Sequence, residues 1–188
     1  MTIDTKDILN SILASVSRID YIKPGEIPNI DLYMDQVTTF MEDQLASSKR
    51  HPEDKILTKT MINNYAKNHL LPPPVKKKYS KEHVVVMIFI YYFKTILSIK
   101  DIETILTPIT EKYFDTDSAV DVASIYEEVC DTAKSQIQNL KDEVREAYET
   151  SQNTFKDMEG LSDSDREYLQ LFSLISSLSF DVYAKKAL

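Results

Sequence analysis

Apolar residues recur at helical spacing along most of the chain, and polar residues fill the positions between them. The first such stripe lies in residues 5–17 and predicts a helix that packs on the rest of the protein or on a partner. Its members are Ile8, Leu9, Ile12, Leu13 and Val16. After a connector that contains Pro24 and Pro28, Asn29 is a good N-cap for a second helix. The apolar side of that second helix comprises Ile30, Tyr33, Met34, Val37, Phe40, Met41 and Leu45.

Residues 57–106 predict three more helices, after a polar loop at residues 47–54. A hydroxyl of Thr58 or Thr60 can cap the first, and the prolines at 72–74 should end it, because proline lacks an N–H group. Ser80 caps the second, whose residues 84–93 are almost all apolar and should therefore be buried. We expect Val85, Ile88, Phe89 and Tyr92 in the interior. Ser98 begins the third, which is short.

The C-terminal part predicts a long helical hairpin, with its boundary at Pro108 and residues 115–117. A helical pattern runs from residue 118 to residue 158, and Gly160 can end it. Ser162 and Asp165 resemble a capping box for a last helix. The apolar stripe of that helix comprises Leu169, Phe172, Ile175, Leu178 and Val182. Two such stripes joined by a short connection favour an antiparallel pair, and the fold class is all-α.

Composition narrows the class of protein. The hydrophobic fraction of 43% is that of a folded domain, and the single cysteine, Cys130, excludes an internal disulfide. The longest apolar run is ten residues, too short to span a membrane, and the acidic start of the chain is unlike a secretory signal. We therefore expect a cytoplasmic protein.

The net charge of −8 is unevenly distributed. Residues 1–48 carry 3 basic and 8 acidic side chains, and residues 101–188 carry 8 basic and 19 acidic ones. Residues 49–100 carry 11 basic and only 3 acidic side chains. A positive segment in an acidic protein indicates an anionic partner, although a lysine cluster by itself is more often a solvated turn.

Motifs of this middle segment resemble the DNA-binding domain of MerR-type regulators. They are the helix that ends near Tyr65, the Leu-Leu-Pro-Pro-Pro run at 70–74, the basic turn, the Tyr-Ser-Lys-Glu start at 79–82 and the Ser-Ile-x-x-Ile pattern from Ser98. The segment is also similar to an uncharacterised bacterial family, the YkrK-like domain of unknown function, in residues 32–37, 61–65, 70–74 and 77–83. The resemblance implies a winged helix-turn-helix core, in which the first of these helices reads DNA and the basic turn belongs to the wing.

The resemblance covers roughly residues 27–106, and together with the helical patterns it predicts three segments. These are an N-terminal helix with its connector (1–26), a helix-turn-helix domain (27–114) and the C-terminal hairpin (115–188). The resemblance also implies double-stranded DNA as the partner. Because a single reader makes few base contacts, we expect a homodimer, with residues 129–148 or the N-terminal helix as the contact between copies. Asparagine side chains can read adenine edges and lysines can hold phosphates. The expected DNA-binding residues are Thr58, Lys59, Thr60, Asn63, Asn64, Lys67, Lys76, Lys77, Lys78 and Lys81.

Two residues depart from the MerR pattern. Asn63 stands where an arginine usually contacts phosphate, and His69 stands where a glycine usually precedes the two leucines. The first departure and the acidic hairpin favour an alternative, a protein-interaction module that kept the fold and lost DNA binding.

No motif for catalysis, nucleotide binding or metal binding is present, so we expect neither an enzyme nor a cofactor. His51, His69 and His83 lack metal-ligand spacing and fit surface or turn positions better. Cys130 fits a buried position on the long helix, and the carboxylates Asp142, Glu143, Glu146 and Glu149 fit a solvated face.

Overall fold

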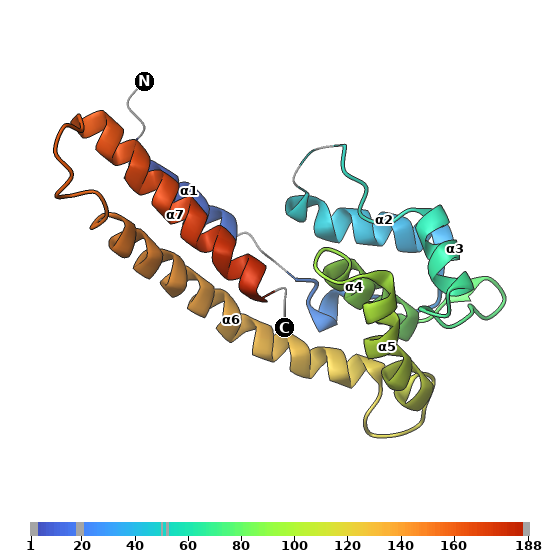
Figure 1. Ribbon diagram of the computed structural model, residues 1–188. Helices are drawn as coiled ribbons and strands as arrows, with labels where there is room; N and C mark the ends of the chain where they lie inside the picture. Colours follow the sequence, from blue (N-terminus) through green and yellow to red (C-terminus); the bar gives the residue numbers. More distant parts are fainter. Residues whose placement is uncertain (1–3, 18–20, 50, 52, 186–188) are drawn as a thin grey trace. The chain divides into compact units, whose positions relative to one another are not determined.

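The computed structural model describes residues 4–17, 21–49, 51 and 53–185, with side chains described as far as Val182. These residues are mostly helical, as predicted, with one small two-stranded sheet (Figure 1). By compactness the chain forms two units, a middle unit of residues 20–133 and a terminal unit of residues 1–19 and 134–188. The boundary falls inside helix α6 (Val122–Ser151). This grouping rests on compactness, and the segment boundaries at residues 26 and 114, which follow chain order, remain predictions.

Helix α4 (Lys81–Phe93) is the centre of the middle unit. All residues from His83 to Ile90 are buried, including Val85, Ile88 and Phe89 as predicted, whereas Tyr92 is only partly buried. A helix that is apolar on every side must be covered on every side. The other elements of the middle unit are η1 (Pro24–Glu26), β1 (Leu32–Tyr33), α2 (Met34–Leu45), η2 (Ala46–Ser48), α3 (Lys59–Lys67), β2 (Lys78–Tyr79), α5 (Ile99–Tyr113) and the start of α6.

The two strands explain why α2 begins later than Asn29. Leu32 pairs with Tyr79 and Tyr33 pairs with Lys78, antiparallel, so the residues before Met34 are held extended. The expected apolar side of α2 is therefore wrong at its start, where Ile30 and Tyr33 are 67% and 51% exposed. A strand of two residues is stabilised by partners 45 and 47 residues away and leaves no pattern of its own in the sequence.

Helix α3 ends at Lys67, before the prolines that we expected to end it. His69 has a φ of 57°, and the Leu70 N–H donates to the Tyr65 carbonyl at 2.9 Å. This left-handed residue and long return bond form a Schellman-type helix end. The glycine of the MerR pattern suits such a conformation, and His69 adopts it here instead.

Helix α5 continues past Pro108 to Tyr113, so Pro108 does not mark a boundary. Proline removes one backbone hydrogen bond to the residue four positions earlier, here Thr104. Both residues are exposed, so water can satisfy the carbonyl that loses its partner. The predicted start at Ser98 is confirmed, since its hydroxyl accepts from the Asp101 N–H at 3.2 Å.

The loop between α2 and α3 is tied to α4. Ile56 and Leu57 are buried in the core, and Lys94 Nζ donates to the Ile56 carbonyl at 2.8 Å. The Ser48 and Tyr91 hydroxyls lie 2.7 Å apart. Burial lowers the pKa of Lys94. Ser48 and Ile56, at the two ends of this connection, are thus fastened to the end of α4.

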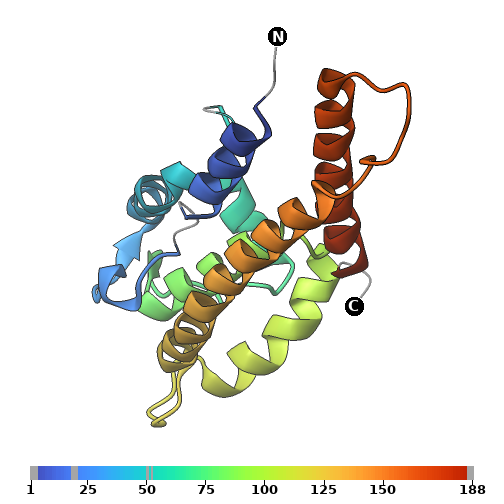
Figure 2. The same ribbon diagram turned by 90° about the vertical axis from the view of Figure 1, so that its left-hand side faces the viewer.

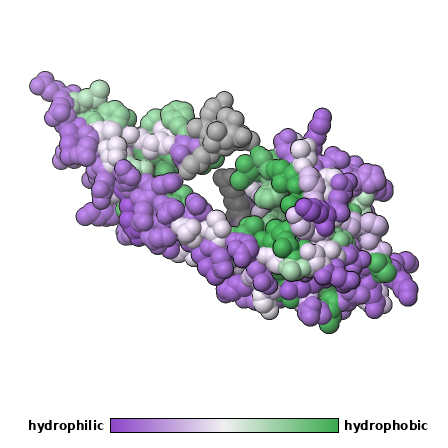
Figure 3. All heavy atoms as spheres, turned by 90° about the horizontal axis from the view of Figure 1, so that it is seen from below, coloured by the Kyte–Doolittle hydropathy of each residue, from purple (hydrophilic) through white to green (hydrophobic). Residues whose placement is uncertain are grey.

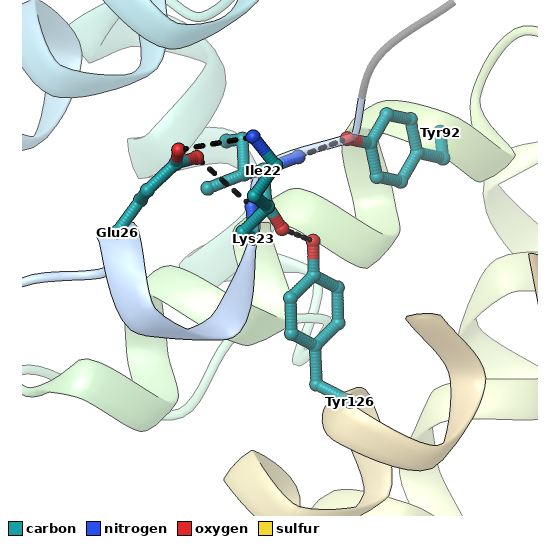
Figure 4. A network of polar contacts seen from close by, with 5 residues as sticks. All are labelled: Ile22, Lys23, Glu26, Tyr92 and Tyr126. Atoms are coloured by element: carbon teal, nitrogen blue, oxygen red, sulfur yellow. Dashed lines mark hydrogen bonds and ion pairs between the residues drawn. The ribbon is translucent and has the colours of Figure 1, made fainter. Parts of the chain in front are cut away.

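Two tyrosines hold the backbone at the start of the middle unit (Figure 4). The Ile22 N–H donates to the Tyr92 hydroxyl at 3.2 Å, and the Tyr126 hydroxyl donates to the Ile22 carbonyl at 2.5 Å. Burial raises the pKa of Tyr92 to about 12 and raises that of Tyr126 further. Both hydroxyls therefore stay protonated and fasten α4 and α6 to the same residue.

The terminal unit contains α1 (Thr5–Ser17), the end of α6, and α7 (Asp163–Lys185). The first has the predicted bounds, and its expected inward face is buried at Val16 and half-buried at its other members. The Thr5 and Tyr148 hydroxyls lie 3.4 Å apart. Helices α6 and α7 run in opposite directions as the predicted hairpin (Figures 1 and 2).

Helix α6 is shorter than predicted, since it begins at Val122 and ends at Ser151 instead of Met158. Side chains of α7 bind the carbonyls after this end. Arg166 donates to the Phe155 carbonyl and, at 2.7 Å, to the Lys156 carbonyl, and Gln170 donates to the Gln152 carbonyl at 2.9 Å. These contacts fasten the loop that follows α6 to the first turns of α7. Gly160 has a φ of 84° but lies in the loop.

The inward face of α7 differs from the predicted stripe. Leu171 and Leu174 are buried, whereas Phe172, Ile175 and Val182 are 60%, 50% and 66% exposed. The predicted cap is confirmed, because the Ser162 hydroxyl accepts from the Asp165 N–H at 3.1 Å. No helix among the described residues combines the length and apolar character that a membrane crossing needs.

Candidate functional site

Helix α3 presents a polar face with no carboxylate. Thr58 caps the helix as predicted, with its hydroxyl accepting from the Met61 N–H at 3.2 Å. Ile62 and Tyr65 anchor the opposite face in the core. Five of the predicted site residues are exposed on this helix, namely Lys59, Thr60, Asn63, Asn64 and Lys67. Spacings of three and four residues place them on one side of the helix, where donors and positive charge alternate.

A tight hairpin follows after residues 68–74. The Val75 N–H donates to the Lys78 carbonyl at 3.1 Å, and the Lys78 N–H donates to the Val75 carbonyl at 2.9 Å. Lys76 and Lys77 form the two-residue tip, with φ of 50° and 66°. Positive φ at both central residues defines a type I′ turn. Pairing of Lys78 with Tyr33 fixes this hairpin to the strand that precedes α2.

The residues at the tip are unusual for the conformation. A type I′ turn favours Asn-Gly, because a Cβ atom in the left-handed region meets the carbonyl oxygen and costs about 1–2 kcal/mol per residue. Lys76 and Lys77 are both exposed, so neither is packed against the core. The hairpin thus carries two charged residues where uncharged ones would be more stable.

Lys78 and Lys81 are placed differently from the tip. Both are half-buried, and Lys78 Nζ lies 5.5 Å from the centre of the Tyr33 ring. Lys81 lies close to Asp121, whose pKa is lowered mainly by the Ser124 backbone N–H and also by Lys81. Part of the Lys81 charge is therefore balanced within the protein, and the exposed charge of the hairpin is at its tip.

Among the three histidines, His51 and His69 are exposed, as expected. His83 lies beneath the hairpin and is buried, so the expected surface or turn position is wrong for this residue. Its Nδ1 accepts from the Ser80 N–H at 3.0 Å, which places the ring proton on Nε2, 3.3 Å from the Pro73 carbonyl. Burial lowers the pKa of His83. The neutral ring joins the proline run to the start of α4 and holds the hairpin in position.

An open, acidic hollow lies beside the N-terminal end of α3, and sequence reasoning missed it. Its volume is about 410 Å³, and it lies between α2 and the loop that precedes Thr58. Its charged lining is Glu42, Asp43, Lys49, Glu53, Asp54 and Lys55. Glu42 and Lys49 form an ion pair. The only signal in the sequence was the charged composition of residues 49–55.

A second hollow, of about 480 Å³, lies between α6 and α7 in the terminal unit. Its lining includes Leu140, Val144 and Ala147 from α6 and Leu178 from α7. The carboxylates of Asp142, Glu143, Glu146 and Glu149 are exposed, as the sequence predicted. Within the described part of the chain, no three His, Cys, Asp or Glu side chains are arranged to hold a metal ion. Cys130 is buried, as expected.

Comparison with known proteins gives one family. A family model described as a domain of unknown function, DUF1836, matches residues 22–129, more than half of the chain. The search of curated proteins and the search of solved structures found no match to the chain. The match begins at Ile22, the residue held by the two tyrosines, and ends inside α6, so it covers nearly all of the middle unit. The chain belongs to the DUF1836 family of domains of unknown function.

Proposed function

We propose that the middle unit binds double-stranded DNA as a MerR-like winged helix-turn-helix domain, and that the protein regulates transcription. The order of elements supports this proposal. A short strand, helices α2 and α3, a hairpin that pairs back to the strand, and helices α4 and α5 follow one another as in the MerR pattern. The connection between α2 and α3 is longer than a helix-turn-helix turn, but hydrogen bonds of Ser48 and Ile56 fasten its two ends to the end of α4.

The observation that carries the proposal is the pair of lysines at the hairpin tip. A strained conformation that persists at an exposed position favours a role for the side chains that adopt it. Lysine ammonium groups on a projecting hairpin can bind phosphates of a backbone that runs past it. Seven residues separate α3 from Val75, so the tip lies within about 30 Å of the helix along the chain.

In this proposal, α3 enters the major groove and the tip holds the flanking backbone. Asn63 and Asn64 face outward on α3 and can each give two hydrogen bonds to an adenine edge. Lys59 and Lys67 extend the positive charge to both ends of the helix. Lys76 and Lys77 then supply the phosphate contact that an arginine makes at the position of Asn63 in the MerR pattern.

The test is a selection of genomic fragments by purified protein, followed by titration of the enriched duplex at several salt concentrations. We expect affinity to fall steeply with salt, because bound lysines release counterions from DNA. Substitution of Asn63 by alanine should weaken binding to the selected sequence by about 1–3 kcal/mol and leave binding to unrelated duplexes unchanged. Absence of binding to any duplex at low salt would refute the proposal.

The acidic hollow beside Thr58 favours a second candidate, a module that binds a basic protein. Its carboxylates repel phosphates near one end of α3, which DNA binding must tolerate. The double substitution of Glu53 by glutamine and Asp54 by asparagine separates the candidates. It should strengthen DNA binding if α3 reads DNA, and it should abolish the interaction if a basic partner occupies the hollow.

A further inference from the structure

Helix α7 has an apolar stripe that the described residues of the terminal unit leave uncovered. Tyr168, Phe172, Ile175 and Val182 are 59%, 60%, 50% and 66% exposed. Their spacing of four, three and seven residues keeps them within about 80° of one another around the helix. Leu171 and Leu174 already bury a different face of α7. Figure 3 shows hydrophobic side chains at the surface of the terminal unit, in the left part of the view.

We propose that this stripe binds the same stripe of a second copy, with the two α7 helices antiparallel. The sequence is self-complementary about Ile175. In an antiparallel pair centred there, Ile175 meets its own copy, Tyr168 lies opposite Val182, and Phe172 lies opposite Leu178. A large side chain thus faces a smaller one at each step away from the centre, which favours interdigitated packing.

The charge distribution selects a second copy as the partner. The protein carries a net charge of −8, so two copies repel each other over most of their surface. Residues 168–180 contain no charged side chain at all. Identical acidic proteins can approach there at the lowest electrostatic cost, whereas a basic partner would be attracted to the carboxylates elsewhere.

The exposed area sets the strength of the pairing. A buried aromatic side chain covers about 150–250 Å², so four half-exposed side chains amount to roughly 400 Å² in each copy. The pair then buries about 800 Å² in total, which is less than the roughly 1,200–2,000 Å² of stable interfaces and is typical of weak, transient ones. We therefore expect a reversible dimer. The dimer does not depend on DNA binding, but it would supply the two copies of α3 that a symmetric DNA site needs.

The first test is the mass in solution at increasing concentration, measured by sedimentation velocity. The unaltered protein should form a dimer, with half dimerised in the range of about 1–100 µM. The variant Phe172→Asp/Ile175→Asp should stay monomeric. Phe180→Asp is the matched control, because Phe180 is 73% exposed yet lies about 120° away from the stripe. That variant should dimerise like the unaltered protein, and thermal melts of all three should show that they fold.

The second test fixes the direction of the helices. Ile175→Cys should form a disulfide with its own copy under mild oxidation, because it lies on the two-fold axis. Tyr168→Cys should not, since antiparallel copies place the two positions about 20 Å apart, but it should cross-link to Val182→Cys in a mixture. A cross-link of Tyr168→Cys with itself would overturn the antiparallel arrangement. A monomeric unaltered protein, or a dimer that the Asp variant leaves intact, would overturn the proposal.

Discussion

Replacement of the hairpin tip by Asn-Gly should stabilise the protein and weaken DNA binding at the same time. In Lys76→Asn/Lys77→Gly, the residues that a type I′ turn favours replace two lysines with φ of 50° and 66°. Relief of left-handed strain gives about 1–2 kcal/mol at the glycine position, and the larger entropy of unfolded glycine subtracts about 0.5–1 kcal/mol. Asparagine adds part of the same relief at Lys76. We expect a net gain near 1 kcal/mol, or about 2–4 °C in Tm for a chain of this size.

The same variant loses two phosphate contacts in the DNA-binding proposal. Each contact contributes about −0.9 to the slope of log affinity against log salt, so the slope should become shallower by about 1.8. If the two contacts contribute nothing at 1 M salt, affinity at 0.1 M salt should fall about 60-fold. Fluorescence anisotropy with a labelled duplex at four salt concentrations measures both quantities, and urea unfolding of the same samples measures stability.

Two control variants separate charge from backbone conformation. Lys76→Arg/Lys77→Arg keeps both the charge and the strained turn, so neither stability nor the salt slope should change. Lys100→Ala/Lys112→Ala removes the same charge from exposed positions on α5, and it should leave the salt slope within error of the unaltered protein. The reasoning fails if the Asn-Gly variant binds DNA with an unchanged slope. It also fails if that variant is less stable, since the turn would then not be strained.

Three further predictions concern the fold. Burial lowers the pKa of His83, so below about pH 6.5 the unfolded chain binds a proton at this residue while the folded chain does not. The free energy of unfolding should therefore fall as the pH drops below about 6.5. Urea midpoints at several pH values measure this, and His51→Asn should keep the same pH dependence whereas His83→Gln should lose it. Tyr126→Phe leaves the buried Ile22 carbonyl without its donor and should cost about 1–3 kcal/mol in urea unfolding; an unchanged midpoint would mean that water replaces the hydroxyl. Arg166→Ala should lower the thermal midpoint of the protein, since several carbonyls after α6 lose one donor, and retention of the unaltered midpoint would show that the loop does not depend on it.

Local signals in the sequence predicted three helix caps correctly. Thr58, Ser98 and Ser162 cap their helices because a hydroxyl within three residues of a free N–H needs no distant partner. The buried run in α4 was equally clear, because an apolar segment that is too short for a membrane has no stable place at the surface. These features depend on residues that are close in sequence, and so a single sequence contains them.

Helix ends and helix faces were predicted less well, because distant residues decide them. Helix α6 ends at Ser151, where Arg166 and Gln170 of the next helix bind the carbonyls that follow. In α7 nearly every residue from 168 to 180 is apolar or serine, so periodicity offers more than one stripe and cannot choose which is buried. Leu169 and Leu178 of the predicted stripe are half-buried, whereas Phe172, Ile175 and Val182 are exposed and form part of the apolar face that we propose for a second copy.

The candidate site was predictable in composition but not in conformation. The sequence identified the lysines at 76–78 as a basic turn, yet it gave no reason to separate them. The structure places Lys76 and Lys77 at the exposed tip, whereas Lys78 is half-buried against Tyr33. Substitution of all three lysines together would therefore mix loss of charge at the tip with loss of a contact that helps hold the hairpin to β1. The tip pair alone tests whether this acidic protein uses its positive hairpin to hold an anion, because we expect the Asn-Gly replacement to keep the fold intact.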